Sequence, residues 1–248
     1  MKIIAWNYRG LRNSATVHGL LNAQKEDPDI LFLSKTKMDR VRIQGFRWKL
    51  GLTNMMSKGC YGKCGGLAIF WRSGIDLHVW QISRMHIDAE VKEADGFVWR
   101  LTGFYEVSAT KKKVLLWKAM CTLNAMRRCP WLCVGDFNEV LVEGEKEGGP
   151  KRKHIYMDSF KEAPKDCDLN DLGFEGDPFT WRNNSHTSEH YIRERLDRVL
   201  AYGERIARFP LYRVINGEPR HSDHRPIIMD TNSLVRRGNQ GETACVLF

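Results

Sequence analysis

Short apolar runs of strand length alternate with segments of helical period along most of the chain. Residues 2–7 form the first apolar run, and residues 14–24 have helical character with Ser14 placed as the N-cap. The sequence Asp-Pro-Asp at residues 27–29 ends that helix, because proline disfavours helical backbone in the residue before it. The apolar run at residues 30–34 is bounded on both sides, which predicts a buried strand and a strand–helix–strand unit.

The next part of the chain, after a basic loop, is rich in β-branched and aromatic residues. Runs at residues 65–72, 76–83 and 97–105 are spaced as successive strands, and residues 83–92 could add one more. Together these runs predict a meander.

Strands and helices alternate again in the second half. An apolar stripe along residues 112–127 predicts a helix, which Pro130 closes before a strand at residues 131–137. The later segments are a loop at 143–153, a helical stretch from Ile155, a strand at 179–183, the segment 193–201 and final strands at 212–217 and 225–230. No linker separates the halves, so the pattern predicts one domain over residues 1–230, built as two sheets packed together with helices outside. Residues 231–248 are polar and aperiodic, which predicts a loose C-terminal tail.

Composition and charge narrow the class of protein. A chain of 248 residues with 42% hydrophobic residues can bury a sizeable core, and it has no apolar run near the roughly 18 residues of a membrane helix. The N-terminus becomes polar too soon for a signal peptide, and seven cysteines without a framework spacing predict free thiols and no zinc, so we expect an intracellular protein. A net charge of +9 favours a polyanionic partner such as nucleic acid; a basic surface without a specific partner is the alternative.

Polar side chains stand where the apolar strands end. They are Asn7, Ser34 with Lys35, Tyr105, Asp136 with Asn138, and Asp223 with His224. Because strand ends of a layered sheet protein converge at one rim, these groups can meet there. Carboxylates beside an amide and an imidazole suit Mg²⁺-assisted phosphoester hydrolysis, whereas each group taken singly also fits a turn, a cap or a surface pair.

Several motifs in this order resemble the endonuclease/exonuclease/phosphatase superfamily with its DNase I-like fold. They are "AWNYRGLRN", "GGLAIFWR", "TGFY", "GDFNEVL", "FTWRN", "RERLDRVLA" and "HSDHRPI", and the nearest resemblance is to the endonuclease domain of plant LINE-type non-LTR retrotransposons. The resemblance implies a four-layer α/β sandwich, with two packed mixed β-sheets flanked by helices. It also implies a Mg²⁺-dependent DNA endonuclease.

The resemblance assigns catalytic roles by matching motif. Asp136 would position or deprotonate the attacking water, and Asn138 would hold the scissile phosphate. His224 would stabilise charge on a phosphate oxygen and be oriented by Asp197, while Tyr105 would reach the phosphate.

The metal site is where the chain departs from the family. Asp223 would contribute to Mg²⁺ binding and Asn7 would tie the cluster together by hydrogen bonds. Lys35 stands where the family has a metal-binding glutamate, so an attraction to the cation becomes a repulsion of several kcal/mol, on the order of 4 kcal/mol per pair at 4 Å. We therefore expect impaired activity, with Lys35 standing in for the cation.

The partner expected from the resemblance is DNA, with no small-molecule cofactor and a monomeric chain, nuclear if functional. Arg9, Lys151, Arg152, Lys153 and Arg182 are candidate contacts to the DNA backbone, with a solvated loop as the alternative for the last four. Thr180 and Trp181 are predicted to be mainly structural.

Two other functions stay open at this point: a non-catalytic nucleic-acid-binding remnant, and another phosphoesterase of the same superfamily. The C-terminal sequence "CVLF" also fits a prenylation signal, although an apolar end to the tail explains it as well. No other membrane attachment is expected.

Overall fold

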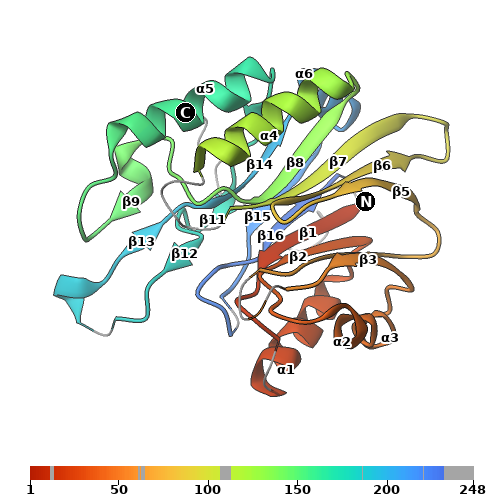
Figure 1. Ribbon diagram of the computed structural model, residues 1–248, viewed down its shortest axis with the longest axis horizontal. Coiled ribbons are helices and arrows are strands. Elements are labelled where there is room, and N and C mark those ends of the chain that lie inside the picture. The colour runs from red at the N-terminus through yellow and green to blue at the C-terminus, as the bar shows by residue number, and fades with distance from the viewer. Residues whose placement is uncertain are drawn as a thin grey trace.

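Two large β-sheets lie face to face, and helices cover the outer side of each (Figure 1). The computed structural model describes residues 1–11, 14–60, 62, 65–106, 113–185, 187–219 and 221–231. The predicted mixed α/β sandwich with flanking helices is therefore confirmed. The predicted tail and its "CVLF" end lie outside the described residues, apart from Thr231, and the single domain over residues 1–230 stays a prediction.

The first sheet has seven strands in the order β11-β15-β16-β1-β2-β4-β3. The strands are β11 (Glu175–Gly176), β15 (Arg213–Asn216), β16 (Ile227–Asp230), β1 (Lys2–Asn7), β2 (Ile30–Ser34), β4 (Leu67–Trp71) and β3 (Asn54–Lys58). β1 and β2 are parallel, so both deliver their carboxyl ends to one edge of the molecule.

The second sheet has six strands in the order β10-β14-β8-β7-β6-β5. They are β10 (Asn170–Asp171), β14 (Asp197–Ala201), β8 (Trp131–Asp136), β7 (Val98–Tyr105), β6 (His86–Lys92) and β5 (Asp76–Ile82). β7 and β8 are also parallel. A smaller sheet, β12 (Trp181–Arg182), β13 (Arg193–Glu194) and β9 (Lys146–Glu147), projects beside the main sandwich at the left of Figure 1.

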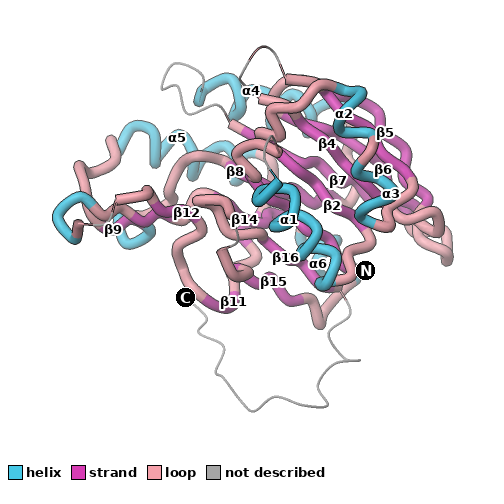
Figure 2. The backbone as a smooth tube through the Cα atoms, turned by 90° about the horizontal axis from the view of Figure 1, so that it is seen from below, coloured by secondary structure: helices cyan, strands magenta, loops and turns pink. Residues whose placement is uncertain are grey.

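Alternation along the strands builds three apolar layers. Ile3 and Ala5 of β1 point into the core between the two sheets, whereas Ile4 and Trp6 point to the helices on the other side. Those helices are α1 (Ser14–Asn22), α2 (Arg40–Gln44) and α3 (Phe46–Leu50), with a 3₁₀ turn at Ala23–Glu26. α4 (Lys113–Met126) and α5 (His154–Asp166) cover the second sheet, and α6 (Gly203–Arg208) follows β14. Figure 2 shows the helices lying outside the strands.

The predicted basic loop after β2 is wrong, since that segment forms α2, α3 and β3. Asp39 caps α2 by accepting a hydrogen bond from the Arg42 amide at 2.8 Å. Ile43, Phe46 and Leu50 bury one side of these short helices on the first sheet. Each of these elements has five residues, which is too short for a helical or strand period to show in the sequence.

A buried ion-pair network fixes the chain that follows β8. Arg198 of β14 is fully buried and donates to the Glu145 carboxylate at 2.7 Å and to the Asp171 carboxylate at 2.8 Å. Burial works against ionisation of Glu145, but Arg198 outweighs it and lowers the pKa of Glu145 to about 2. The segment carrying Glu145, which includes a 3₁₀ turn at Glu143–Glu145, is thereby anchored to the second sheet.

Among the described helices, none combines the length and apolar character needed to cross a lipid bilayer.

Candidate active site

The carboxyl ends of β1, β2, β7 and β8 meet at a pocket of about 250 Å³. Parallel pairing sets Asn7 beside Ser34 in the first sheet and Tyr105 beside Asp136 in the second. The residues that line the pocket are Asn7, Arg9, Lys35, Tyr105, Asp136, Asn138, Arg152, Trp181, Glu194, Leu196 and His224. The structure thus brings together residues as far apart in sequence as Asn7 and His224, which are 217 positions apart.

A glycine places Asp136 at the end of its strand. Gly135 has φ +132°, and a Cβ built on it would lie 2.1 Å from the carbonyl oxygen of Phe104 on the neighbouring strand. Only glycine tolerates that approach and that backbone together. β8 can therefore run against β7 to its last residue and present Asp136 to the pocket.

A continuous chain of hydrogen bonds runs through the site. The Asn7 side-chain amide donates to Asp136 Oδ2 at 2.7 Å and lies 3.1 Å from His224 Nε2. On its other side, His224 Nδ1 lies 2.8 Å from Asp197 Oδ2, which also accepts from the Thr180 hydroxyl at 2.8 Å. All five side chains are buried, so the ring of His224 is held in one orientation.

Backbone hydrogen bonds hold the residues of this hydrogen-bond chain in place. Trp181 and His224 form an isolated antiparallel bridge, and the Thr180 hydroxyl accepts hydrogen bonds from the amides of Leu196 and Asp197, both at 2.9 Å. Thr180, predicted to be structural, therefore holds Asp197 in place. Asp197 itself lies behind His224 and does not line the pocket.

Burial and charge shift the titration of the two central groups. Burial lowers the pKa of His224, but the carboxylates of Asp197 and Asp136 outweigh burial, so the pKa of His224 is raised overall. Burial, together with the negative charge of Asp197, raises the pKa of Asp136 to about 6. The site is therefore poised to hold a protonated imidazole beside a carboxylate that gains and loses a proton near neutral pH.

We expect Asp136→Asn to raise the thermal stability of the chain at pH 8. A carboxyl whose pKa is raised on folding adds stability below its unfolded pKa, and that contribution is lost as the pH rises through the folded pKa of about 6. The amide carries no such penalty, and a shift of about two units sets an upper limit of about 3 kcal/mol on the gain. Thermal unfolding between pH 4 and 8 measures it. The advantage should close near pH 4, and an equal advantage at every pH would contradict the assignment.

The other side of the pocket is cationic. Arg9 forms an ion pair with Asp223 at 2.7 Å, and the Trp181 indole donates to the same carboxylate oxygen at 2.6 Å. Lys35 follows β2 and lines the pocket, where burial and then the charge of Arg9 lower its pKa. Arg9, Lys35 and Asn138 all have left-handed backbone, with φ of 51°, 55° and 53°. Such backbone is costly for residues with a side chain and clusters at functional sites.

A second ion pair lines the same pocket, and the sequence analysis predicted only one of its two residues as a site residue. The predicted DNA contact Arg152 donates to Glu194 Oε1 at 3.0 Å, and Glu194 also accepts from Lys146. Glu194 and Leu196 stand just before Asp197 in the segment 193–201, but no period marks them as pocket residues. Trp181, predicted to be a packing residue, also reaches the pocket.

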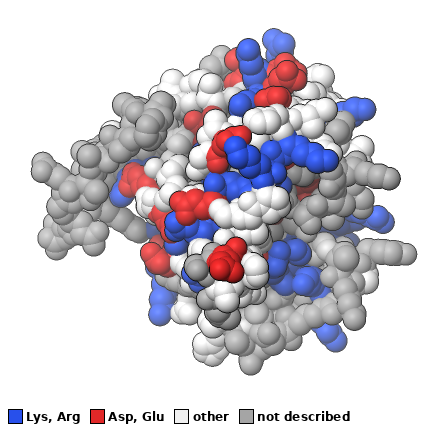
Figure 3. Space-filling model, turned by 90° about the vertical axis from the view of Figure 1, so that its left-hand side faces the viewer, with Lys and Arg blue, Asp and Glu red and all other residues white. Residues whose placement is uncertain are grey.

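The remaining predicted DNA contacts lie outside the pocket. Lys151, Lys153 and Arg182 are exposed, and Lys151 pairs with Glu143 at 3.2 Å. Figure 3 shows basic and acidic side chains of the described residues interspersed on one face of the molecule. A role for these three residues in contacting DNA stays a prediction.

The polar groups of the pocket fit a magnesium ion poorly. Asp136, Asp197 and His224 each offer a ligand atom, and these atoms lie within 4.8 Å of one another. However, His224 and Asp197 already bind each other, and Asp223 has one carboxylate oxygen held by Arg9 and Trp181. Magnesium requires several oxygen ligands, and here the cations Lys35 and Arg9 share the pocket with few of them.

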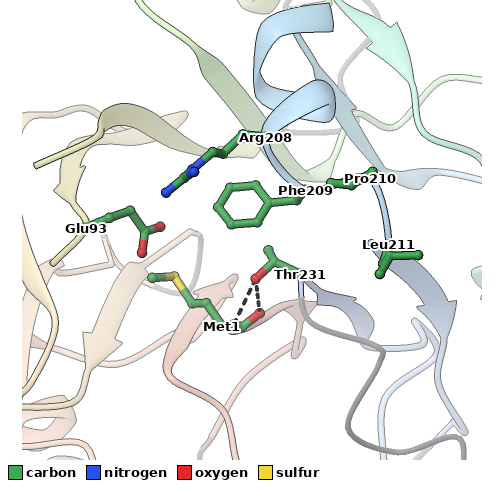
Figure 4. Close-up of a pocket in the computed structure, with 7 residues that line it drawn as sticks. All are labelled: Met1, Glu93, Arg208, Phe209, Pro210, Leu211 and Thr231. Carbon is green, nitrogen blue, oxygen red and sulfur yellow. Dashed lines mark hydrogen bonds between the residues drawn. The ribbon is translucent and has the colours of Figure 1, made fainter. Parts of the chain in front are cut away.

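A second cavity of about 300 Å³ lies elsewhere, where Met1 and Thr231 meet (Figure 4). The amino group of Met1 donates to the Thr231 hydroxyl at 2.8 Å, and Glu93, Arg208, Phe209, Pro210 and Leu211 complete the wall. It contains none of the predicted catalytic residues. The smaller pocket at the strand ends is therefore the candidate active site.

Comparisons with known proteins agree with this geometry. A sequence model of the Endonuclease/Exonuclease/phosphatase family matches residues 4–224. Among curated proteins, no sequence matches the chain significantly.

Solved structures of the same fold include a 3'-5' exonuclease, NExo, from Neisseria meningitidis, with a TM-score of 0.70, 21% identity, and coverage of 93% of this chain and 99% of that one. A second structure of the Neisseria protein, described as a 3' phosphatase bound to a product DNA hairpin, has a TM-score of 0.69, 21% identity, and coverage of 93% and 98%. The endonuclease domain of TRAS1, a telomere-specific non-LTR retrotransposon, has a TM-score of 0.69, 14% identity, and coverage of 92% and 97%.

Proposed function

The chain belongs to the endonuclease/exonuclease/phosphatase family, and on that premise we propose that it is a DNA endonuclease-type phosphodiesterase domain derived from a non-LTR retrotransposon, with activity reduced by Lys35. The observation that carries this proposal is the hydrogen-bonded chain from Asp136 through Asn7 and His224 to Asp197 at a pocket rim. A buried imidazole between two carboxylates suits phosphoester hydrolysis better than it suits a structural role.

The proposed mechanism uses the groups that the pocket presents. Asp136, with its pKa raised to about 6, orients a water molecule and accepts its proton near neutral pH. His224, protonated and held by Asp197, donates a hydrogen bond to the phosphoryl oxygen on which negative charge develops. Asn138 and Tyr105 line the same pocket and position the phosphate.

We propose Mg²⁺ dependence only for a site with the family's glutamate at position 35, because the positive charge of Lys35 repels a divalent cation. Asp223 and Asn7 would hold the ion in that form. In the present chain Lys35 and Arg9 instead supply positive charge beside Asp136 and Asp223.

DNA is the proposed partner for two reasons. The chain carries a net charge of +9, and similar folds include a non-LTR retrotransposon endonuclease domain and a protein bound to a DNA hairpin. A plant LINE origin, a nuclear location and a monomeric state belong to the same proposal.

Lys35 favours a second candidate, a nucleic-acid-binding domain without catalysis. That candidate shares the fold and the charge, and differs only in turnover. Another phosphoesterase of the same superfamily is the third candidate, since one of the similar structures is described as a 3' phosphatase.

A supercoiled-plasmid assay separates the three functions. The purified chain is expected to bind plasmid in a salt-sensitive manner and to nick it slowly, with His224→Ala removing the nicking, because His224 supplies the charge stabilisation. Assays run with EDTA, with Mg²⁺ and with soluble phosphomonoesters complete the test. Binding without any nicking would identify the non-catalytic domain, whereas turnover of soluble esters alone would identify the third function.

A further inference from the structure

Lys35 differs from the other cations of the active-site pocket in having no bonded carboxylate. Arg9 is paired with Asp223 at 2.7 Å, and Arg152 is paired with Glu194 at 3.0 Å. Among the described residues, no carboxylate oxygen lies within ion-pair distance of the Lys35 ammonium. Lys35 therefore brings a positive charge to the pocket that no residue neutralises directly.

Three cations line the pocket, and two of them are paired with carboxylates: Arg9 with Asp223 and Arg152 with Glu194. Glu194 is already shared between Arg152 and Lys146. Asp136 is occupied too, since it accepts hydrogen bonds from Asn7 at 2.7 Å and from the Asn138 amide at 2.9 Å. Among the described cations that line the pocket, Lys35 therefore keeps its charge available to an anion.

The chemistry of the wall selects the class of anion. The side chain of Asn138 lines the same space as Lys35, and its amide carries two N–H groups that can donate to an anion. Tetrahedral oxyanions match several converging donors better than a flat carboxylate does, and a half-buried site strengthens each of these interactions. A volume of about 250 Å³ admits a phosphate with the sugar that carries it.

Backbone conformation shows that these donors are held in position. Lys35, Arg9 and Asn138 occupy the left-handed region, although each has a side chain. The turn at Lys35 is fixed on both sides, because the Tyr8 amide donates to the Ser34 carbonyl at 3.0 Å and the Thr36 amide donates to the Gly66 carbonyl at 3.1 Å. The surrounding hydrogen bonds thus hold Lys35 in a backbone conformation that lysine does not favour, at the wall of the pocket.

We propose that this pocket binds a phosphate group of a nucleic acid directly on Lys35, with no divalent metal ion. The inference rests on the proposed function and deepens it, because it states what the same site holds in this chain. The ammonium takes one phosphate oxygen, and the side-chain amide of Asn138 takes another. Binding in this manner is insensitive to EDTA and depends on the charge at position 35.

The test measures phosphate binding in EDTA. Two probes are used: inorganic phosphate, and a DNA hairpin with a terminal 3'-phosphate, each titrated at constant ionic strength and followed by calorimetry and by the NMR signal of the His224 ring. Lys35→Met is expected to weaken binding of both probes about tenfold or more, since it removes the charge and keeps the length of the side chain. Lys49→Met, which removes an exposed lysine of α3, is the matched control and should bind as the wild-type chain does.

Each outcome decides the question. Binding of both probes shows that the phosphate alone supplies the affinity, whereas binding of the hairpin alone shows that the sugar is also needed. Either result supports the inference if the binding is lost in Lys35→Met. Equal affinity in Lys35→Met and wild type, or binding that appears only with Mg²⁺, overturns it. The plasmid assay does not depend on these titrations, so the inference can fail while the proposed function stands.

Discussion

Lys35→Glu is expected to give Mg²⁺-dependent plasmid nicking at least about a hundredfold faster than the wild-type chain. Replacing the ammonium by a carboxylate turns a repulsion of a divalent ion into an attraction, and each charge pair at 4 Å is worth about 4 kcal/mol at an effective dielectric of 20. The new carboxylate would join Asn7 and the free oxygen of Asp223, which is buried and has no hydrogen-bond partner among the described residues. About 3 kcal/mol of regained stabilisation is enough for a hundredfold effect.

Two variants control this experiment. Lys35→Gln removes the positive charge without adding a ligand and should give a smaller gain. Lys49→Glu makes the same change in net charge at an exposed position of α3 and should leave the nicking rate unchanged. If Lys35→Glu and wild type nick equally fast with Mg²⁺, position 35 does not control the metal site.

Asp197→Asn is expected to lower the pKa of His224 and, in the Lys35→Glu chain, to slow nicking by about a hundredfold. The amide keeps the shape of the carboxylate and still accepts a hydrogen bond from Thr180, but it no longer stabilises the protonated ring. Burial opposes protonation of His224, and the carboxylate of Asp197 is the largest of the charges that favour it. Ring signals followed by NMR across the pH range measure the shift directly, whether or not the chain is active.

Thr180→Val is the companion variant. Valine has nearly the shape of threonine and removes only the hydroxyl that fixes Asp197, so the pKa of His224 should fall less than in Asp197→Asn. Unchanged titration of His224 in Asp197→Asn would show that the carboxylate only orients the ring.

Local patterns were enough to predict the larger elements. β1, β2 and β8 are continuous apolar runs, as expected for strands that are buried on both faces of a sheet. α4 has an apolar stripe of period 3.6. The helix predicted over residues 14–24 forms, but Ser14 is its first helical residue and not its N-cap, and it ends as α-helix at Asn22 and continues as a 3₁₀ turn. α2, α3 and β3 were missed because each has only five residues and gains its stability from the sheet beneath it.

The site divides in the same way. Local sequence patterns place polar residues at the strand ends and predict that Asn7, Asp136 and His224 meet, because strands of a layered sheet share a rim. The partners of each residue within that rim depend on the three-dimensional fold. Arg9 holds Asp223, Arg152 holds Glu194, Trp181 faces the pocket, and Lys35 is left unpaired. Hydrogen bonds and ion pairs act over a few ångströms between segments far apart in the chain, so no periodicity records them, and the role of a charge such as that of Lys35 depends on which neighbours the fold leaves free.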